Sequence, residues 1–235
     1  MNRNILTTEG VHKKYGGNVV LRDVSVKIKQ GEIYGLIGKN GSGKTTLFRI
    51  LTGQIFDYHG KVTINGINGK AAKVSAVINS PALFLNMSAS QNLKSQAFLL
   101  GVHDDGKIES VLVKVGLRGC GKKAVKEFSL GMTQRLKLAM ALLDNPDILI
   151  LDEPSNGLDP DGIAELRGML LELNRSSGVT LLISSHILSE LEQIATVIGI
   201  LHDGRILEEV SMKEIHEKGA TLESLYIESI SGVRA

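Results

Sequence analysis

Short hydrophobic runs of two kinds alternate with longer helical stretches along this 235-residue chain. Residues 24–28 alternate apolar and polar side chains, which is the period of a strand with one buried face. Residues 148–151 and 180–183 are continuous apolar runs, which are typical of parallel strands buried on both faces. A helix predicted over 159–175 lies between these two runs and completes a β-α-β unit. The pattern therefore predicts the α/β class.

The rest of the chain carries further strand signals and one long helical block. Strands are predicted at 19–21, 61–66, 74–78 and 197–201; the second enters a turn at Asn-Gly, and the last leaves through Asp203-Gly204. Helical patterns cover 88–121, opened by the capping-box pair Ser88 and Gln91, and 130–143, and the tail from 211 predicts one or two short helices. Because the block interrupts the α/β alternation, we expect a helical subdomain at about 80–145.

The strongest chemical motif lies between the predicted strand 32–37 and the predicted helix 45–51. Its sequence matches G-x-x-x-x-G-K-[ST], the phosphate-binding P-loop, and the strand–loop–helix context is the one that this loop needs. Its glycines let backbone N–H groups point at phosphate oxygens, and the helix N-terminus adds positive charge. The candidate nucleotide-binding residues are Gly38, Lys39, Asn40, Gly41, Ser42, Gly43, Lys44, Thr45 and Thr46.

Two acidic residues follow the apolar run 148–151. In this loop type, Lys44 reaches the β- and γ-phosphates and Thr45 holds Mg²⁺. At the end of a neighbouring strand, Asp152 is placed to hold the same metal, and Glu153 to polarise an attacking water. Alone, an acidic pair after a strand is more often a helix cap. The P-loop upstream favours the catalytic interpretation.

Two weaker signals accompany these motifs. Ser129 and Gly131 precede the helical stretch after 130, where they form either a helix cap or an anion site. His186 follows the strand 180–183, so it is either a structural histidine or a contact to a γ-phosphate.

Composition limits the partners and the cellular location that we expect for this protein. The net charge of +2 gives no reason to expect a nucleic-acid partner. The single cysteine, Cys120, permits no disulfide within the chain, which fits a reducing compartment. No run approaches the ~18 apolar residues of a membrane span, and the N-terminus has no signal-peptide pattern. We therefore expect a cytoplasmic protein, with any membrane span supplied by another chain.

The order of these motifs resembles that of the ATP-binding cassette ATPases of ABC transporters. It runs from the P-loop through Ser129-Leu130-Gly131, the strand with Asp152-Glu153, and the segment 155–159 to His186, and covers roughly residues 5–210. The ordered set is far more specific than any single motif. The resemblance implies a P-loop NTPase with a RecA-like core, an N-terminal antiparallel β layer and the inserted helical subdomain, all in one domain over 1–235.

The resemblance also implies roles for individual residues. Tyr15 is then the aromatic side chain that stacks on adenine, and His186 is the switch histidine. Residues 128–132 form the signature motif, Asp159 is the D-loop aspartate, and Asn79 takes the Q-loop position near the metal. Lys44, Glu153 and His186 become the expected catalytic residues, and Thr45, Asp152 and Asn79 the metal-binding ones.

The sequence departs from the family pattern at two points. Leu130 and Met132 replace the usual third-position glycine and fifth-position glutamine of the signature, and Asn79 replaces the usual Gln or Glu. The variant Ser-Leu-Gly-Met-x-Gln-Arg resembles the signature motif in the ATPases of bacterial bacitracin and lantibiotic exporters.

The resemblance predicts an ATP- and Mg²⁺-dependent ATPase subunit at the inner face of the cell membrane. Two copies, or one copy and a related ATPase, would sandwich ATP between the P-loop of one chain and Ser129–Met132 of the other. A separate transmembrane permease would export a drug or antimicrobial peptide. The alternatives are an import ATPase, a non-transport ABC ATPase of translation or DNA maintenance, and a P-loop kinase.

Overall fold

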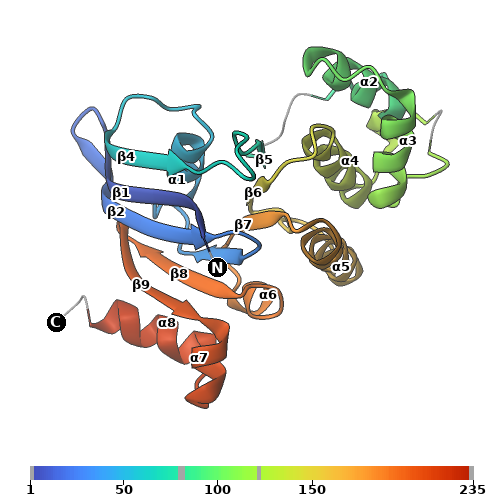
Figure 1. Ribbon diagram of the computed structural model, residues 1–235. Helices are drawn as coiled ribbons and strands as arrows, with labels where there is room; N and C mark the ends of the chain where they lie inside the picture. The colour runs from blue at the N-terminus through green and yellow to red at the C-terminus, as the bar shows by residue number, and fades with distance from the viewer. Residues whose placement is uncertain (1–2, 79–82, 121–122, 233–235) are drawn as a thin grey trace.

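A six-stranded sheet forms the centre of the protein. The computed structural model describes residues 3–78, 83–120 and 123–232 (Figure 1). The strand order is β5-β6-β7-β3-β8-β9, in which β9 is antiparallel to β8 and the other strands are parallel. The strands are β3 (Ile33–Ile37), β5 (Val74–Val77), β6 (Ile148–Asp152), β7 (Thr180–Ser185), β8 (Val197–His202) and β9 (Arg205–Ser211).

A second, antiparallel sheet packs against the first. Its order is β2-β1-β4, with β1 (Asn4–Tyr15), β2 (Asn18–Lys29) and β4 (His59–Ile64). In β2, Val24, Val26 and Ile28 are buried, as the alternating pattern predicts. They share a core with Tyr34 and Leu36 of β3.

The central strands are buried on both faces, which explains their continuous apolar runs. Ile33 and Ile37 of β3 belong to one core, whereas Tyr34 and Leu36 point into the core shared with the antiparallel sheet. The alternate residues of β6 divide between the same two cores. Since both faces are covered, a polar side chain in these strands is confined to their ends.

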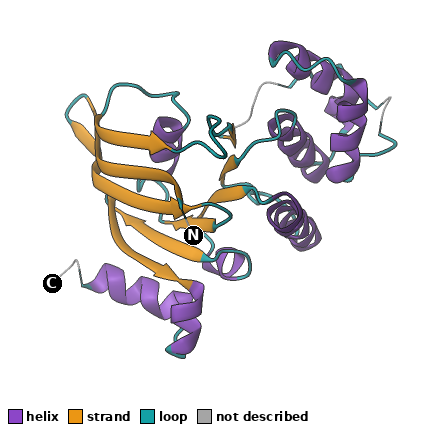
Figure 2. Cartoon of the chain, in the orientation of Figure 1, coloured by secondary structure: helices purple, strands orange, loops and turns teal. Residues whose placement is uncertain are grey.

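Most of the helices lie to the right of and below the sheets in the view of Figure 2. The predicted helical block contains α2 (Ala89–Leu99), α3 (Asp105–Lys114) and α4 (Leu130–Leu142), which lie together on the far side from β1 and β2 (Figure 1). Ser88 and Gln91 form the predicted capping box of α2. The limits of about 80 and 145 for a separate subdomain stay a prediction. The remaining helices are α1 (Lys44–Leu51), α5 (Pro160–Ser177), α6 (Leu188–Glu192), α7 (Met212–Glu217) and α8 (Leu222–Ser231), with a 3₁₀ turn at Val125–Glu127.

One predicted turn lies three residues further along the chain. β4 ends at Ile64, but Asn65 extends the sheet edge by donating its backbone N–H to the Ile5 carbonyl at 2.8 Å. The two-residue turn instead uses Asn68 and Gly69, whose φ angles of 50° and 77° suit a turn with both central residues left-handed. The Asp203-Gly204 turn between β8 and β9 is confirmed, with φ angles of 44° and 76°.

A buried tyrosine connects the central strand to the edge strand β9. The Tyr34 hydroxyl donates to Glu209 Oε1 at 2.8 Å. It lies over Gly199, where a Cβ would collide with the hydroxyl, so β8 needs glycine there. Burial raises the pKa of the Glu209 carboxyl, and the hydrogen bond from Tyr34 opposes that shift only in part. The folded protein therefore carries an ionised carboxylate in an unfavourable setting at neutral pH.

We expect Glu209→Gln to stabilise the fold at neutral pH, because it keeps an oxygen acceptor for Tyr34 and removes the buried charge. The raised pKa means that the native chain binds this proton more readily than the unfolded chain does. The wild-type carboxyl therefore loses its stabilising contribution as pH rises through the raised pKa. Urea unfolding between about pH 5 and pH 8 should show the advantage of the variant shrinking as pH falls toward the ordinary glutamate range of about 4.3. An advantage that does not change with pH would contradict this account.

Candidate functional site

The P-loop follows β3 at the centre of the larger sheet and leads into α1. Gly41 and Gly43 have φ angles of 83° and 112°, which side chains rarely tolerate. A Cβ at Gly38 would collide with the Leu201 carbonyl and lie 2.6 Å from Ser42 Oγ. The loop thus depends on glycine both for its backbone conformation and for its close packing against β8.

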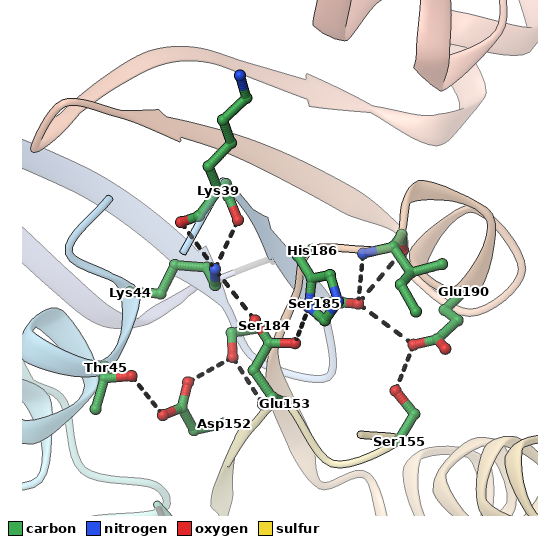
Figure 3. A network of polar contacts seen from close by, with 12 residues as sticks. Lys39, Lys44, Thr45, Asp152, Glu153, Ser155, Ser184, Ser185, His186 and Glu190 are labelled. Atoms are coloured by element: carbon green, nitrogen blue, oxygen red, sulfur yellow. Dashed lines mark hydrogen bonds and ion pairs between the residues drawn. The ribbon is translucent and has the colours of Figure 1, made fainter. Parts of the chain in front are cut away.

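The Lys44 ammonium is folded back into this loop. Its Nζ donates to the Gly38 carbonyl at 2.6 Å and to the Lys39 carbonyl at 3.3 Å. It also forms an ion pair with Glu153 Oε1 at 3.1 Å, and the lysine side chain is only 6% exposed. Lys44 is therefore held between the loop carbonyls and the carboxylate at the end of β6 (Figure 3).

A continuous polar network joins the predicted catalytic residues to two of the predicted metal-binding residues, Thr45 and Asp152 (Figure 3). Thr45 Oγ1 donates to Asp152 Oδ2 at 2.6 Å, and Ser184 Oγ donates to Asp152 Oδ1 at 2.6 Å. Ser184 Oγ also accepts the Glu153 N–H at 2.9 Å. His186 Nδ1 lies 2.6 Å from Glu153 Oε2. The structure thus brings together these residues from three separate segments of the sequence.

Sheet register explains this meeting. Asp152 of β6 is paired with Ser184 of β7, and Ile37 of β3 is paired with Ser185. The carboxyl ends of three parallel strands therefore lie at one edge, where ligands bind in open α/β sheets. Glu153 has a φ of 49°, and this left-handed turn directs the chain away from the sheet immediately after Asp152.

The residues at this edge fit a nucleotide with Mg²⁺. In the part of the chain that the structure describes, Ser42 Oγ is the buried side-chain oxygen or nitrogen that has no hydrogen-bond partner. It lies inside a loop whose amides suit phosphate oxygens. Mg²⁺ prefers oxygen ligands and retains waters and phosphates in its coordination shell. Thr45 and Asp152 supply two adjacent oxygens, and the described residues contain no group of three His, Cys, Asp or Glu side chains that would form a self-sufficient metal site.

Ser129 and Gly131 are not part of this polar network. Ser129 Oγ accepts the Met132 N–H at 3.2 Å and so caps α4. With Leu130, Gly157 and Asp159, both residues line a cavity of about 360 Å³ between α4 and the start of α5. No hydrogen bond or ion pair between described residues joins this cavity to the P-loop. Within one chain, the predicted signature residues therefore do not meet Lys44.

The other predicted nucleotide-binding residues differ in how exposed they are. Tyr15 is 48% exposed at the tip of the β1–β2 hairpin, with Lys13 Nζ 4.8 Å from its ring centroid. The Val20 carbonyl, further along β2, lies close to Gly43, so the start of β2 adjoins the P-loop. Lys39, Asn40 and Gly41 are exposed and Thr46 is half-buried. Asn79 lies outside the described residues, so its position stays a prediction.

Sequence reasoning missed Ser184 as a functional residue. Its hydroxyl contacts both Asp152 and the Glu153 backbone. A polar Ser184-Ser185 pair directly after a continuous apolar strand was the available signal, since a fully buried strand tolerates hydroxyls only where they have partners.

Known proteins match this chain over most of its length. A family model described as "ABC transporter" matches residues 21–156. YcbN of Bacillus subtilis (strain 168), an uncharacterized ABC transporter ATP-binding protein, is 44% identical over 97% of this chain and 75% of its own length. The bacitracin transport ATP-binding protein BcrA of Enterococcus faecalis is 41% identical over 91% of this chain and 71% of its own length. The lantibiotic transport ATP-binding protein SrtF of Streptococcus pyogenes is 42% identical over 94% and 96%.

Solved structures agree with the fold. An ATP-binding subunit of an ABC transporter superposes with a TM-score of 0.82 at 28% identity, over 96% of this chain and 99% of that chain. None of the helices in the described ranges combines the length and hydrophobicity that a membrane span requires. The expected P-loop fold and its antiparallel β layer are confirmed. On the evidence of motif order, fold and relatives, this chain belongs to the ABC transporter family, as one of its ATP-binding ATPase subunits.

Proposed function

We propose that this subunit hydrolyses Mg²⁺-ATP at the edge formed by β3, β6 and β7, and that hydrolysis powers export of an antimicrobial peptide. The observation that carries the proposal is the position of Glu153, whose two carboxylate oxygens contact Lys44 at 3.1 Å and His186 at 2.6 Å. A carboxylate held beside the phosphate-binding lysine is well placed to act on a water near the γ-phosphate.

Each residue of the network has one task in this mechanism. Lys44 exchanges its contact with Glu153 for a phosphate oxygen, which frees Glu153 Oε1 to orient the attacking water. His186 holds Oε2 of the same carboxylate. Ser184 fixes both Asp152 and the Glu153 backbone, and Thr45 and Asp152 would hold the metal. Bound Mg²⁺ supplies the positive charge that neutralises the phosphate oxygens.

A complete site in this proposal needs two chains. Ser129 and Gly131 have the anion-binding character of a helix N-terminus, yet the cavity that they line includes no residue of the P-loop. We infer that they face the nucleotide of a second subunit, either an identical copy or a related ATPase. We also propose that Tyr15 at the hairpin tip stacks on the adenine, and that Asn79, which lies outside the described residues, is a contact to the metal.

The relatives support a proposal for the cargo and for the location. BcrA and SrtF are named for bacitracin and lantibiotic transport, and both cover more than nine-tenths of this chain. We therefore assign this subunit to a peptide exporter, attached at the inner face of the membrane to a separate transmembrane permease. Expressed with that permease, the chain should raise the concentration of bacitracin or a lantibiotic needed to stop growth. Protection that persists with Glu153→Gln would contradict hydrolysis-driven export.

Lys44→Ala and Glu153→Gln should fail at different stages. Removing the ammonium should weaken triphosphate binding about 10- to 100-fold, since hydrogen bonds to charged groups contribute about 1.5–3 kcal/mol. Glu153→Gln should leave binding nearly intact and lower turnover about 100-fold or more, because only the water-orienting carboxylate is lost. Nucleotide titration and phosphate release measure the two effects separately. Wild-type turnover by Glu153→Gln would remove the role assigned to this carboxylate.

Mixing two inactive variants tests the two-chain site. Ser129→Arg and Lys44→Ala homodimers should each be inactive, because every site lacks one component. Their heterodimer has one site with both residues intact and one site with neither, so phosphate release should reappear on mixing. If crosslinking demonstrates mixed dimers and no activity returns at any ratio, independent composite sites are ruled out. Full activity of Ser129→Arg alone would remove Ser129 from the nucleotide site.

A further inference from the structure

The carboxylate of Glu190 connects the segments that carry Glu153 and His186. Glu190 lies on α6, and its Oε2 accepts hydrogen bonds from Ser155 Oγ and, at 3.3 Å, from Ser185 Oγ. Ser155 is two residues beyond Glu153, and Ser185 immediately precedes His186. Figure 3 shows the three side chains meeting beside the Glu153–His186 pair.

Each serine transmits this contact to the backbone beside a proposed catalytic residue. Ser185 Oγ also accepts the Ile187 N–H at 2.9 Å, so the backbone on both sides of His186 is tied to one hydroxyl. On the other segment, the Glu153 carbonyl accepts the Asn156 N–H at 3.2 Å and the Ser155 carbonyl accepts the Leu158 N–H at 3.0 Å. Ser155 thus anchors a compact turn that begins at Glu153.

This anchoring becomes important when Lys44 changes partner. Before that step, Glu153 is held from one side by Lys44 and from the other by His186. Once the ammonium turns to a phosphate, the side-chain contact left to Glu153 is the one with His186. The spacing of these two residues then depends on how firmly their backbone segments are joined.

We propose that Glu190 is a positioning residue for ATP hydrolysis, whose carboxylate holds the turn 153–158 and the segment 185–187 at a fixed spacing. The inference rests on the proposed function of Glu153. The hydrogen bonds of Glu190 to described residues go to Ser155 and Ser185 and not to the P-loop or the Thr45–Asp152 pair, so we expect it to act on the chemical step and not on nucleotide binding. As a carboxylate it has only acceptors, which is what two converging hydroxyl donors require.

Steady-state phosphate release by the full-length subunit with Mg²⁺ and ATP tests this role. Glu190→Ala should lower kcat about tenfold or more while KM stays within about twofold, because misplacement of a reacting group by a fraction of an ångström has a large kinetic cost. Glu190→Gln keeps one oxygen acceptor and should recover kcat to within about threefold of wild type. Glu192→Ala removes a carboxylate from the same helix, two residues away, and should behave as wild type.

Hydrogen exchange on the nucleotide-free protein gives a readout that does not depend on activity. Glu190→Ala should speed exchange in peptides covering 154–158 and 185–188 and leave exchange in the rest of the chain unchanged. Glu192→Ala should leave exchange in those two peptides at the wild-type rate. Faster exchange throughout would indicate general destabilisation and overturn the positioning role. If Glu190→Ala does not fold, Ser155→Ala replaces it, with Ser155→Thr as the variant that restores the hydroxyl.

Three results would overturn the inference: wild-type kcat in Glu190→Ala, a loss that falls on KM alone, or Glu190→Gln as impaired as Glu190→Ala. Glu153→Gln measured in parallel separates this failure from failure of the proposed function. If Glu153→Gln loses turnover and Glu190→Ala keeps it, only the role of Glu190 is wrong. If Glu153→Gln itself turns over ATP normally, the proposed function fails first.

Discussion

The pairing of β6 with β7 is the constraint on which the site depends. It places Asp152 opposite Ser184, and from that one register follow the hydrogen bonds of Ser184 to Asp152 and to the Glu153 backbone. A slip of one residue would point these side chains into opposite cores. Because both strands are apolar on both faces, their polar carboxyl ends distinguish this register from a slipped one: the Ser184 hydroxyl meets its partner Asp152 only in the observed pairing.

At the edge of this sheet, the charge of Lys44 is neutralised by groups packed directly against it. The Lys44 ammonium is enclosed by two backbone carbonyls and one carboxylate, while the same carboxylate contacts His186. A buried ammonium needs such partners, because removing it from water without them is costly. A triphosphate offers stronger partners than backbone carbonyls do. Without nucleotide, the carbonyls and the carboxylate occupy the positions around Lys44 that phosphate oxygens would take. Phosphate binding would therefore release Glu153 from Lys44.

The sequence predicts features that depend on local patterns. Residues close together in the chain determine four of these features. They are the P-loop, its flanking strand and helix, the helical block with its cap at Ser88, and the Asp203-Gly204 turn. Contacts over long sequence distances were harder to predict. Ser184 meets Asp152 across 32 positions and Ser155 meets Glu190 across 35, and both contacts require the strand register and the path of α6. The turn at Asn68-Gly69 was misplaced because two Asn-Gly pairs lie three residues apart, and only tertiary contacts decide between them.

The central claim is that nucleotide and metal bind at the edge of β3, β6 and β7, and that Lys44 changes partner when they do. A crystal structure of Glu153→Gln with ATP and Mg²⁺ tests it most directly. The account predicts the metal against Thr45 Oγ1 near Asp152, with Lys44 Nζ moved from the Gly38 carbonyl to a phosphate oxygen. Nucleotide bound elsewhere, or bound here with Lys44 still on the Gly38 carbonyl, would contradict it.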